Sequence, residues 1–223
     1  MQETVVRNMP FCDEFIIVTK ESYRNIVIGQ MKAFQSLKYR VVLEGSPKGT
    51  AAAIMLGSQF CNQSELVFVV TADNLIEGQE YKDAIIRAKE LAKQGSIVAL
   101  GVKPAKKNSN FGYLLRDEEN VLKFIEKIRL DDDESFGYDD GFLWNSGMFL
   151  YRAGDLINAA RAICPELYDT CRMAKLKVAA IRRTVRISQK VMKANPQGSI
   201  ERLIIARGNG IPLERCRECL RLR

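Results

Sequence analysis

The chain of 223 residues contains no histidine. Without imidazole it has neither the most common general base nor any serine or cysteine triad that depends on one. Catalysis by this chain would therefore have to use carboxylates, lysines, backbone amides or a bound metal ion.

Long apolar runs are also missing. No run approaches the roughly 20 residues that cross a bilayer, and the start, MQETVVRN, has no basic segment followed by an apolar stretch. We therefore expect a cytoplasmic protein with no membrane partner. The six cysteines are scattered, and the one close pair, Cys216 and Cys219, lacks the further ligands that a zinc site needs. Reduced, incidental thiols are the simplest interpretation, and a metal or redox role for this pair stays open.

The net positive charge of the chain comes from its last third. Residues 1–150 hold 18 Lys and Arg against 21 Asp and Glu, whereas residues 151–223 hold 16 against 6, which gives the formal net charge of +7. A uniformly basic surface would favour nucleic acid, because neutralised phosphates release counterions. With a mildly acidic front, nucleic acid is not the expected partner.

Apolar and amphipathic segments alternate over the first hundred residues. Short β-branched runs predict buried strands, and longer stretches with one apolar face predict helices. We expect strands at 15–19, 40–44, 66–71 and 96–102, and helices at 21–36, 50–60 and 81–94. Shorter strand-like pieces follow at 111–117, 121–127 and 143–151, and the stretch from 153 to about 195 is predicted to be helical.

This alternation predicts an α/β fold, with a mostly parallel, Rossmann-like mixed sheet and helices on both faces. The pieces after Pro104 would extend the same sheet in antiparallel or mixed fashion. Ligands of such sheets bind at the carboxyl ends of the strands. That rule directs attention to residues 44–50 and 71–74.

Polar residues interrupt or end several of these apolar strands. Asp73 follows the most apolar one, where a carboxylate either caps a turn or faces a cleft or cation. Glu126 and Lys127 could form an ordinary surface ion pair. Residues 144–148, WNSGM, place a polar triplet inside an apolar strand, and its glycine would permit close approach of a ligand.

Taken in order, five short motifs resemble those of the mannose-1-phosphate guanylyltransferase family, within the sugar-phosphate nucleotidyltransferase superfamily. The family shows PADH, GIxP, GYGY, FVEKP and WNSGMF. The corresponding stretches are 71–74 (TADN), 100–104 (LGVKP), 110–113 (NFGY), 124–127 (FIEK) and 143–149 (LWNSGMF). The resemblance begins at residue 2 and weakens beyond about residue 167.

The resemblance implies a nucleotidyltransferase fold and transfer of GMP from GTP to mannose 1-phosphate, giving GDP-mannose and pyrophosphate. It implies Mg²⁺ as cofactor, with Asp73 as a metal ligand and catalytic residue. By the same match Lys127 would hold the sugar phosphate, and Glu126 and Asn145 would bind sugar hydroxyls. Gly112, without a side chain, would let the sugar lie against the backbone.

A further stretch, residues 44–53, resembles the family's EGRNTAPA near the base. Thr50 and Ala51 are kept, and Lys48 stands where arginine is usual. The match implies that all three contact the substrate. An ammonium at residue 48 would not reproduce the two-pronged hydrogen bonding of a guanidinium.

Two family segments have no counterpart here. One is the glycine-rich nucleotide loop that should precede Gln2, and the other is a GWSDVG-like stretch with a second metal carboxylate. We therefore expect residues 1–200 to form a nucleotidyltransferase-like domain truncated at its N-terminus. Residues 201–223 would form a basic, cysteine-containing tail, either a solvated helix or the product of a disrupted reading frame.

Three functions stay open at this point. The first is the guanylyl transfer itself. The second is a catalytically incapable subunit of the same fold that binds a sugar phosphate or assembles with another chain, because a sheet without its first strand exposes an edge that invites pairing, in a homo-oligomer for example. The third is a related hexose-1-phosphate nucleotidyltransferase with another sugar or base, which Lys48, Gly49 and Asn74 leave open.

Overall fold

A computed structural model describes residues 1–74, 76, 79–104, 111–117, 120–125, 141–176, 179–181 and 183–207. The described residues divide into two compact units, one from residues 1–65 and 156–207 and the other from residues 66–155. The predicted domain boundary at residue 200 stays a prediction, because most of the tail lies outside the described residues. No helix in the described part has both the length and the apolar character that a bilayer crossing requires.

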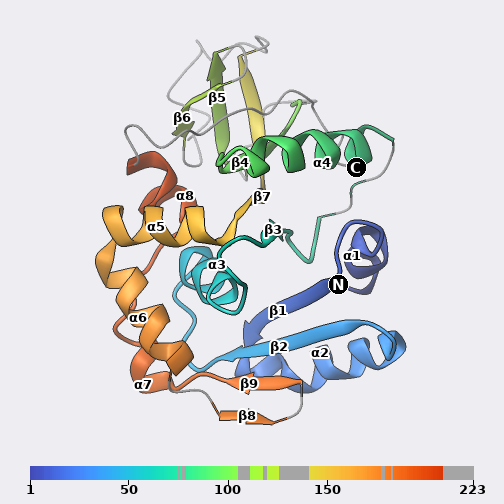
Figure 1. The fold of residues 1–223 in the computed structure, drawn as a ribbon, viewed down its shortest axis with the longest axis vertical. Coiled ribbons are helices and arrows are strands. Elements are labelled where there is room, and N and C mark those ends of the chain that lie inside the picture. The colour runs from blue at the N-terminus through green and yellow to red at the C-terminus, as the bar shows by residue number, and fades with distance from the viewer. Residues whose placement is uncertain are drawn as a thin grey trace. The chain divides into compact units, whose positions relative to one another are not determined.

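A four-stranded sheet forms the centre of the first unit, in the order β1-β2-β9-β8 (Figure 1). The strands are β1 (Glu14–Lys20), β2 (Lys38–Glu44), β8 (Ala179–Ile181) and β9 (Thr184–Arg186). The pairings β1–β2 and β2–β9 are parallel, and β8 is antiparallel to β9. The predicted parallel pairing is therefore found in this sheet.

Helices cover both faces of this sheet. Phe15 and Ile17 of β1 pack with Val27 and Met31 of α2 (Arg24–Met31). The alternate residues Ile16 and Val18 face Gly57 of α3 (Thr50–Ser58). Since neighbouring strand residues point to opposite faces, α2 and α3 lie on opposite sides of the sheet.

The remaining helices of the first unit are short or follow the second unit in sequence. They are α1 (Gln2–Asn8), α5 (Ala153–Ile163, which begins in the second unit), α6 (Pro165–Leu176), α7 (Gln189–Met192) and α8 (Ile200–Leu203), with 3-10 turns at Glu21–Tyr23, Lys32–Phe34 and Ile205–Arg207.

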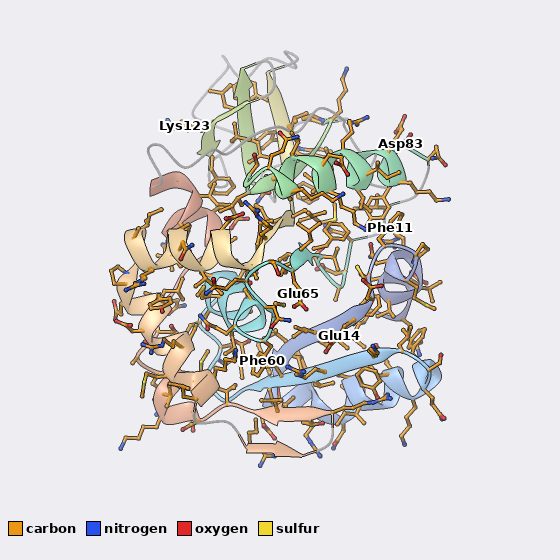
Figure 2. The ribbon with its side chains drawn as sticks, in the orientation of Figure 1. Phe11, Glu14, Phe60, Glu65, Asp83 and Lys123 are labelled. Carbon is orange, nitrogen blue, oxygen red and sulfur yellow. The ribbon has the colours of Figure 1, made fainter. Side chains whose placement is uncertain are left out.

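Figure 2 labels Glu14, the first residue of β1, whose carboxylate lies 3.7 Å from the guanidinium of Arg40 on β2.

A five-stranded sheet forms the second unit. Its elements are β3 (Leu66–Val69), α4 (Gln79–Lys93), β4 (Val98–Val102), β5 (Tyr113–Asp117), β6 (Asn120–Ile125) and β7 (Phe142–Arg152). The long strand β7 is antiparallel to β3, β4 and β5, and β5 is antiparallel to β6. Helix α4 packs against β7, β4 and β3.

Two features differ from the sequence-based expectation. Strands β3 and β4 run in the same direction but are not neighbours, because β7 pairs with both through Phe149 and Leu150. The described pairs of the second sheet are therefore antiparallel, although a mostly parallel sheet was predicted. The stretch from residue 153 to about 195 is not wholly helical either, since it contains β8 and β9. Strand β9 pairs with β2 and β8 pairs with β9. These are tertiary interactions that helical periodicity does not reveal.

Candidate functional site

The loop after β3 carries the acid that the sequence singled out. Asp73 and the preceding Ala72 are exposed, whereas Thr71 and Asn74 on either side are half-buried. A short loop with an exposed acid between two partly buried residues presents its carboxylate to solvent. Asp73 is thus placed where a cation or a phosphorylated ligand can reach it.

Strand β7 has a β-bulge at the predicted polar triplet. Leu100 of β4 is opposite Met148, but the next residue, Gly101, is opposite Asn145, so Ser146 and Gly147 have no partner in β4. Gly147 has φ +69°, a left-handed conformation that favours glycine. Bulges of this kind redirect side chains and are frequent next to binding sites.

Hydrogen bonds connect the loop, the bulge and β4. The side-chain amide of Asn74 donates to the carbonyl oxygen of Ser146 at 2.8 Å. The Ser146 hydroxyl donates to the carbonyl of Leu100 and accepts the amide hydrogen of Met148 at 3.2 Å. The second-unit segments that bear Asp73 and Asn145 are therefore directly joined.

Asn145 is also tied to the segment before β5. Its backbone N–H donates to the carbonyl of Gly112 at 2.8 Å, and its side-chain oxygen accepts the N–H of Gly147 at 3.1 Å. The rings of Phe111 and Trp144 lie beside this contact, with centroids 5.0 Å apart. The structure thus brings three predicted site residues, Asp73, Gly112 and Asn145, onto mutually bonded segments.

The surroundings of Gly112 give a second reason for its lack of a side chain. A Cβ atom there would lie 2.9 Å from the Phe124 ring and 3.3 Å from the carbonyl oxygen of Ile125. Packing against β6 therefore already favours glycine at this position, and the predicted contact with a sugar stays a prediction.

The predicted residues of the base segment lie in the first unit. Thr50 begins α3, and its hydroxyl accepts the backbone N–H of Ile200 at 3.2 Å. Ala51 is fully buried and donates its N–H to the carbonyl of Gly198 at 3.3 Å, while the carbonyl of Lys48 accepts the N–H of Gly198 at 3.0 Å. In the structure these three residues fix the loop after β2 to the segment before α8.

Glu44, the last residue of β2, was not among the predicted site residues. It is only 6% exposed, and its Oε1 atom is buried with no hydrogen-bond partner in the part of the chain that the structure describes. Burial raises the pKa of this carboxyl to about 7, while the charge of Lys20, opposite it on β1, lowers the pKa by less. A buried acid with an unsatisfied oxygen at the end of a parallel strand is a candidate ligand-binding group.

Two further buried polar atoms belong to the second unit. The Thr71 hydroxyl and the Trp144 indole N–H have no hydrogen-bond partner among the described residues. Buried polar groups normally have a partner, whether protein, water or ligand. A signal for Thr71 existed in the sequence, because threonine there replaces the proline of the related motif.

Asp73 is the one predicted metal ligand, and it lies among the described residues. Glu126 and Lys127 lie outside the described residues. Among residues that are described, no three His, Cys, Asp or Glu side chains are grouped as metal ligands. Asp73 by itself is compatible with Mg²⁺, which retains several waters and takes one or two carboxylates together with substrate phosphates.

Two of the described cysteines, Cys61 and Cys171, are not suited to nucleophilic catalysis. Burial raises the pKa of Cys61 to about 11 and that of Cys171 to about 12. Both thiols are therefore protonated near neutral pH, and a thiol is a weak nucleophile compared with its thiolate. Cys216 and Cys219 lie outside the described residues.

Comparison with known proteins decides the family. The family model described as "Nucleotidyl transferase" matches residues 1–202. The chain belongs to the nucleotidyl transferase family. One curated relative is a mannose-1-phosphate guanylyltransferase of Salmonella muenchen, 28% identical over 215 residues, which are 90% of this chain and 45% of the relative. The chain spans about half the length of the curated relatives it matches.

Solved structures agree with this fold. A structure titled mannose-6-phosphate isomerase from Helicobacter pylori is 29% identical, with a TM-score of 0.87 over 96% of this chain and 85% of that one. A structure titled mannose-1-phosphate geranyltransferase from Thermus thermophilus is 18% identical, with a TM-score of 0.76 over 99% of this chain and 64% of that one. Together with the family model they show the α/β nucleotidyltransferase fold, here with one largely parallel and one antiparallel sheet.

Proposed function

We propose that this chain transfers GMP from GTP to the phosphate of mannose 1-phosphate, giving GDP-mannose and pyrophosphate. The observation that carries the proposal is the 2.8 Å hydrogen bond between Asn74 and Ser146. It joins the loop that presents Asp73 to the strand that carries Asn145, so an acid and an amide on motifs far apart in the sequence can serve one ligand. The names of the curated relatives support the choice of reaction.

The chemistry suits a chain without histidine. The attacking oxygen belongs to a sugar phosphate that is already ionised, so no general base is needed. Catalysis then consists of aligning two polyanions and neutralising charge at the α-phosphorus. In this proposal Lys127 holds the sugar phosphate, while Glu126, Asn145 and the backbone at Gly112 contact the sugar.

Asp73 would hold Mg²⁺ in this proposal. When bound, the ion supplies charge neutralisation for the phosphates. The exposed position of Asp73 fits this role, because a single carboxylate then meets a cation that the substrate phosphates also bind.

Glu44 supports guanine as the base. Guanine presents two neighbouring N–H donors, and an ionised carboxylate accepts hydrogen bonds only. The buried Glu44 oxygen, for which the described segments supply no partner, would accept one of them. Because the pKa of Glu44 is about 7, GTP binding should weaken as the pH falls below 7 and the carboxyl becomes protonated. Lys48, Thr50 and Ala51, on the following loop, would contact the same substrate.

A pyrophosphate-release assay with GTP, mannose 1-phosphate and Mg²⁺ tests the proposal. We expect turnover that falls by roughly 10²-fold or more in both variants, because Asp73→Asn weakens binding of the Mg²⁺ that neutralises the phosphates, and Lys127→Ala removes the cation that holds the attacking sugar phosphate. Lys123→Ala, a change at an exposed lysine on β6, is the matched control and should retain activity. Turnover that neither Asp73→Asn nor Lys127→Ala reduces would contradict the site.

A second candidate comes from the Helicobacter pylori structure, whose title names an isomerase. Both that title and the guanylyltransferase names contain a mannose phosphate, which supports a mannose phosphate as the sugar substrate. Incubation with mannose 6-phosphate distinguishes the two reactions. Formation of a ketose phosphate without GTP would favour isomerisation, whereas nucleotide-dependent pyrophosphate release favours guanylyl transfer. Binding of mannose 1-phosphate without either reaction would identify a binding subunit.

A further inference from the structure

The loop that bears Asp73 is hydrogen-bonded to the β7 bulge at one end and lies close to the same bulge at the other. Asn74 donates a hydrogen bond to the carbonyl of Ser146 at 2.8 Å. At the other end, the methyl group of Thr71 lies 3.1 Å from the position that a Cβ atom on Gly147 would occupy. Asp73 lies between these two contacts and is exposed.

The group in the bulge that accepts the Asn74 hydrogen bond, the Ser146 carbonyl, belongs to a residue with further hydrogen bonds. Ser146 is 5% exposed, and its hydroxyl both donates to Leu100 and accepts from Met148. The neighbouring Gly147 N–H donates to the side-chain oxygen of Asn145. These bonds hold the Ser146 carbonyl in place. The hydrogen bond from Asn74 to that carbonyl therefore restrains the position of the loop that bears Asp73.

We infer that Asn74 is a positioning residue, which holds the Asp73 carboxylate at a fixed place relative to Asn145. The inference rests on the proposed function, in which Asp73 and Asn145 serve one substrate. Asn74 itself need not touch that substrate. Its amide acts through the loop, because misplacing a reacting group by about 1 Å can cost roughly 10²-fold in rate.

The alternative is that Asn74 only stabilises the fold. Such a role would lower the melting temperature and leave the kinetic constants of the folded protein unchanged. A positioning role instead lowers kcat, with little change in the KM for mannose 1-phosphate, because the sugar contacts on β7 and before β5 remain in place.

Two variants of Asn74 separate these roles. Asn74→Leu keeps a similar shape and removes the donor, whereas Asn74→His keeps an N–H that can reach a carbonyl oxygen. We expect kcat to fall roughly 30-fold to 100-fold in Asn74→Leu, with the KM for mannose 1-phosphate within about 3-fold, and to recover to within about 5-fold of wild type in Asn74→His. Asn62→Leu, which removes an exposed asparagine bonded to Glu65 in the first unit, is the matched control and should leave kcat unchanged.

An unchanged kcat in Asn74→Leu would overturn the inference, and so would a loss of kcat that Asn74→His does not restore. A melting temperature that falls without any change in kcat would assign Asn74 to stability alone.

A second readout does not require activity. In the free protein, NMR order parameters of the Asp73 amide and hydrogen exchange of the Gly147 amide report how firmly loop and bulge are held. We expect a lower order parameter and faster exchange in Asn74→Leu, and values close to wild type in Asn74→His. If the wild-type chain shows no turnover, the proposed function fails, and these measurements decide the inference: unchanged values in Asn74→Leu overturn it.

Discussion

Glu44 and Asp73 are both acids at the end of an apolar strand, one in each unit, yet their surroundings are opposite. Glu44 is 6% exposed, and burial raises its pKa to about 7. Asp73 is exposed in a loop that the Asn74 hydrogen bond joins to Ser146 and whose Thr71 end lies close to Gly147. An acid after an apolar strand therefore does not by itself indicate whether the carboxylate is buried or displayed. The packing around each strand end decides it.

The largest expected effect concerns the loop after Glu44. Gly49 has φ +96°, and a Cβ atom there would overlap the carbonyl oxygen of Gly198. Gly49→Ala should therefore lower the free energy of unfolding by about 3 kcal/mol or more, since the backbone must shift and adopt a strained conformation. Urea denaturation measures this value.

The control for that substitution is Gly29→Ala in α2. Gly29 has ordinary backbone angles, and apart from its own helix backbone and chain neighbours no described residue has an atom within 4 Å of the added Cβ. Because alanine is the better helix former, Gly29→Ala should raise stability by about 0.5–1 kcal/mol. If both substitutions had the same effect, the close packing of the loop after β2 would be refuted.

Glu44→Gln removes the buried charge and comes next in size. The folded pKa of Glu44 is about 7 against an ordinary value of 4.5, so between these values the folded state binds more protons than the unfolded state. Stability contributed by Glu44 is then lost as the pH rises through this window. Relative to wild type, Glu44→Gln should stabilise by up to about 3 kcal/mol at pH 8 and by nearly nothing at pH 4.

Glu65, an exposed acid of the same unit, is expected to change stability with pH in the opposite direction. Hydrogen bonds from the backbone and side chain of Asn62 lower the pKa of Glu65, so its contribution is present at neutral pH and is lost as the pH falls through the lowered value. Glu65→Gln should therefore reduce stability slightly at pH 8. Thermal unfolding of Glu44→Gln and Glu65→Gln over pH 4–8 checks both predictions. If the change in stability relative to wild type had the same pH dependence in the two variants, the two acids would not differ in environment as described.

Gly147→Ala tests the second-unit side of the comparison. The substitution places a Cβ in a left-handed conformation, 3.1 Å from the Thr71 methyl group. We expect a loss of about 1–2 kcal/mol in stability and a lower kcat, because the loop that holds Asp73 must move. Parallel unfolding and turnover measurements would show both effects, and a fully active variant would argue against the loop–bulge contact.

The smallest effect is expected for Thr50→Val. The change removes the oxygen that accepts the N–H of Ile200, at a cost of about 1 kcal/mol. Thr50→Ser keeps the hydroxyl and should retain most of that stability. If, in addition, the KM for GTP rises in Thr50→Val and not in Thr50→Ser, the hydroxyl also serves the predicted substrate contact.

Local sequence signals predict most of the individual elements. The apolar runs at 15–19 and 40–44 lie within β1 and β2, and the predicted helix at 81–94 coincides closely with α4. These segments are long or strongly patterned, so local residues determine them. Strands β8 and β9 were missed because three residues give no period. Their pairing, β9 with β2 and β8 with β9, is a tertiary interaction.

The candidate site was predictable only in part. The ordered motifs located Asp73, Gly112 and Asn145, and the structure places them on joined segments. The position of β7 between β3 and β4, and the bulge that presents Ser146 to Asn74, depend on strand order and register, which the sequence pattern does not contain. The buried state of Glu44 likewise follows from the packing around the carboxyl end of β2.

The central claim is that the Asp73 loop, the residues before β5 and the β7 bulge bind one phosphorylated mannose. Titration of the isotopically labelled chain with mannose 1-phosphate and Mg²⁺, followed by amide NMR, tests it most directly. We predict saturable shift changes that include residues 71–74, 111–112 and 144–147 together and that share one dissociation constant. Saturable changes confined to other parts of the chain, or no changes at all, would contradict the claim.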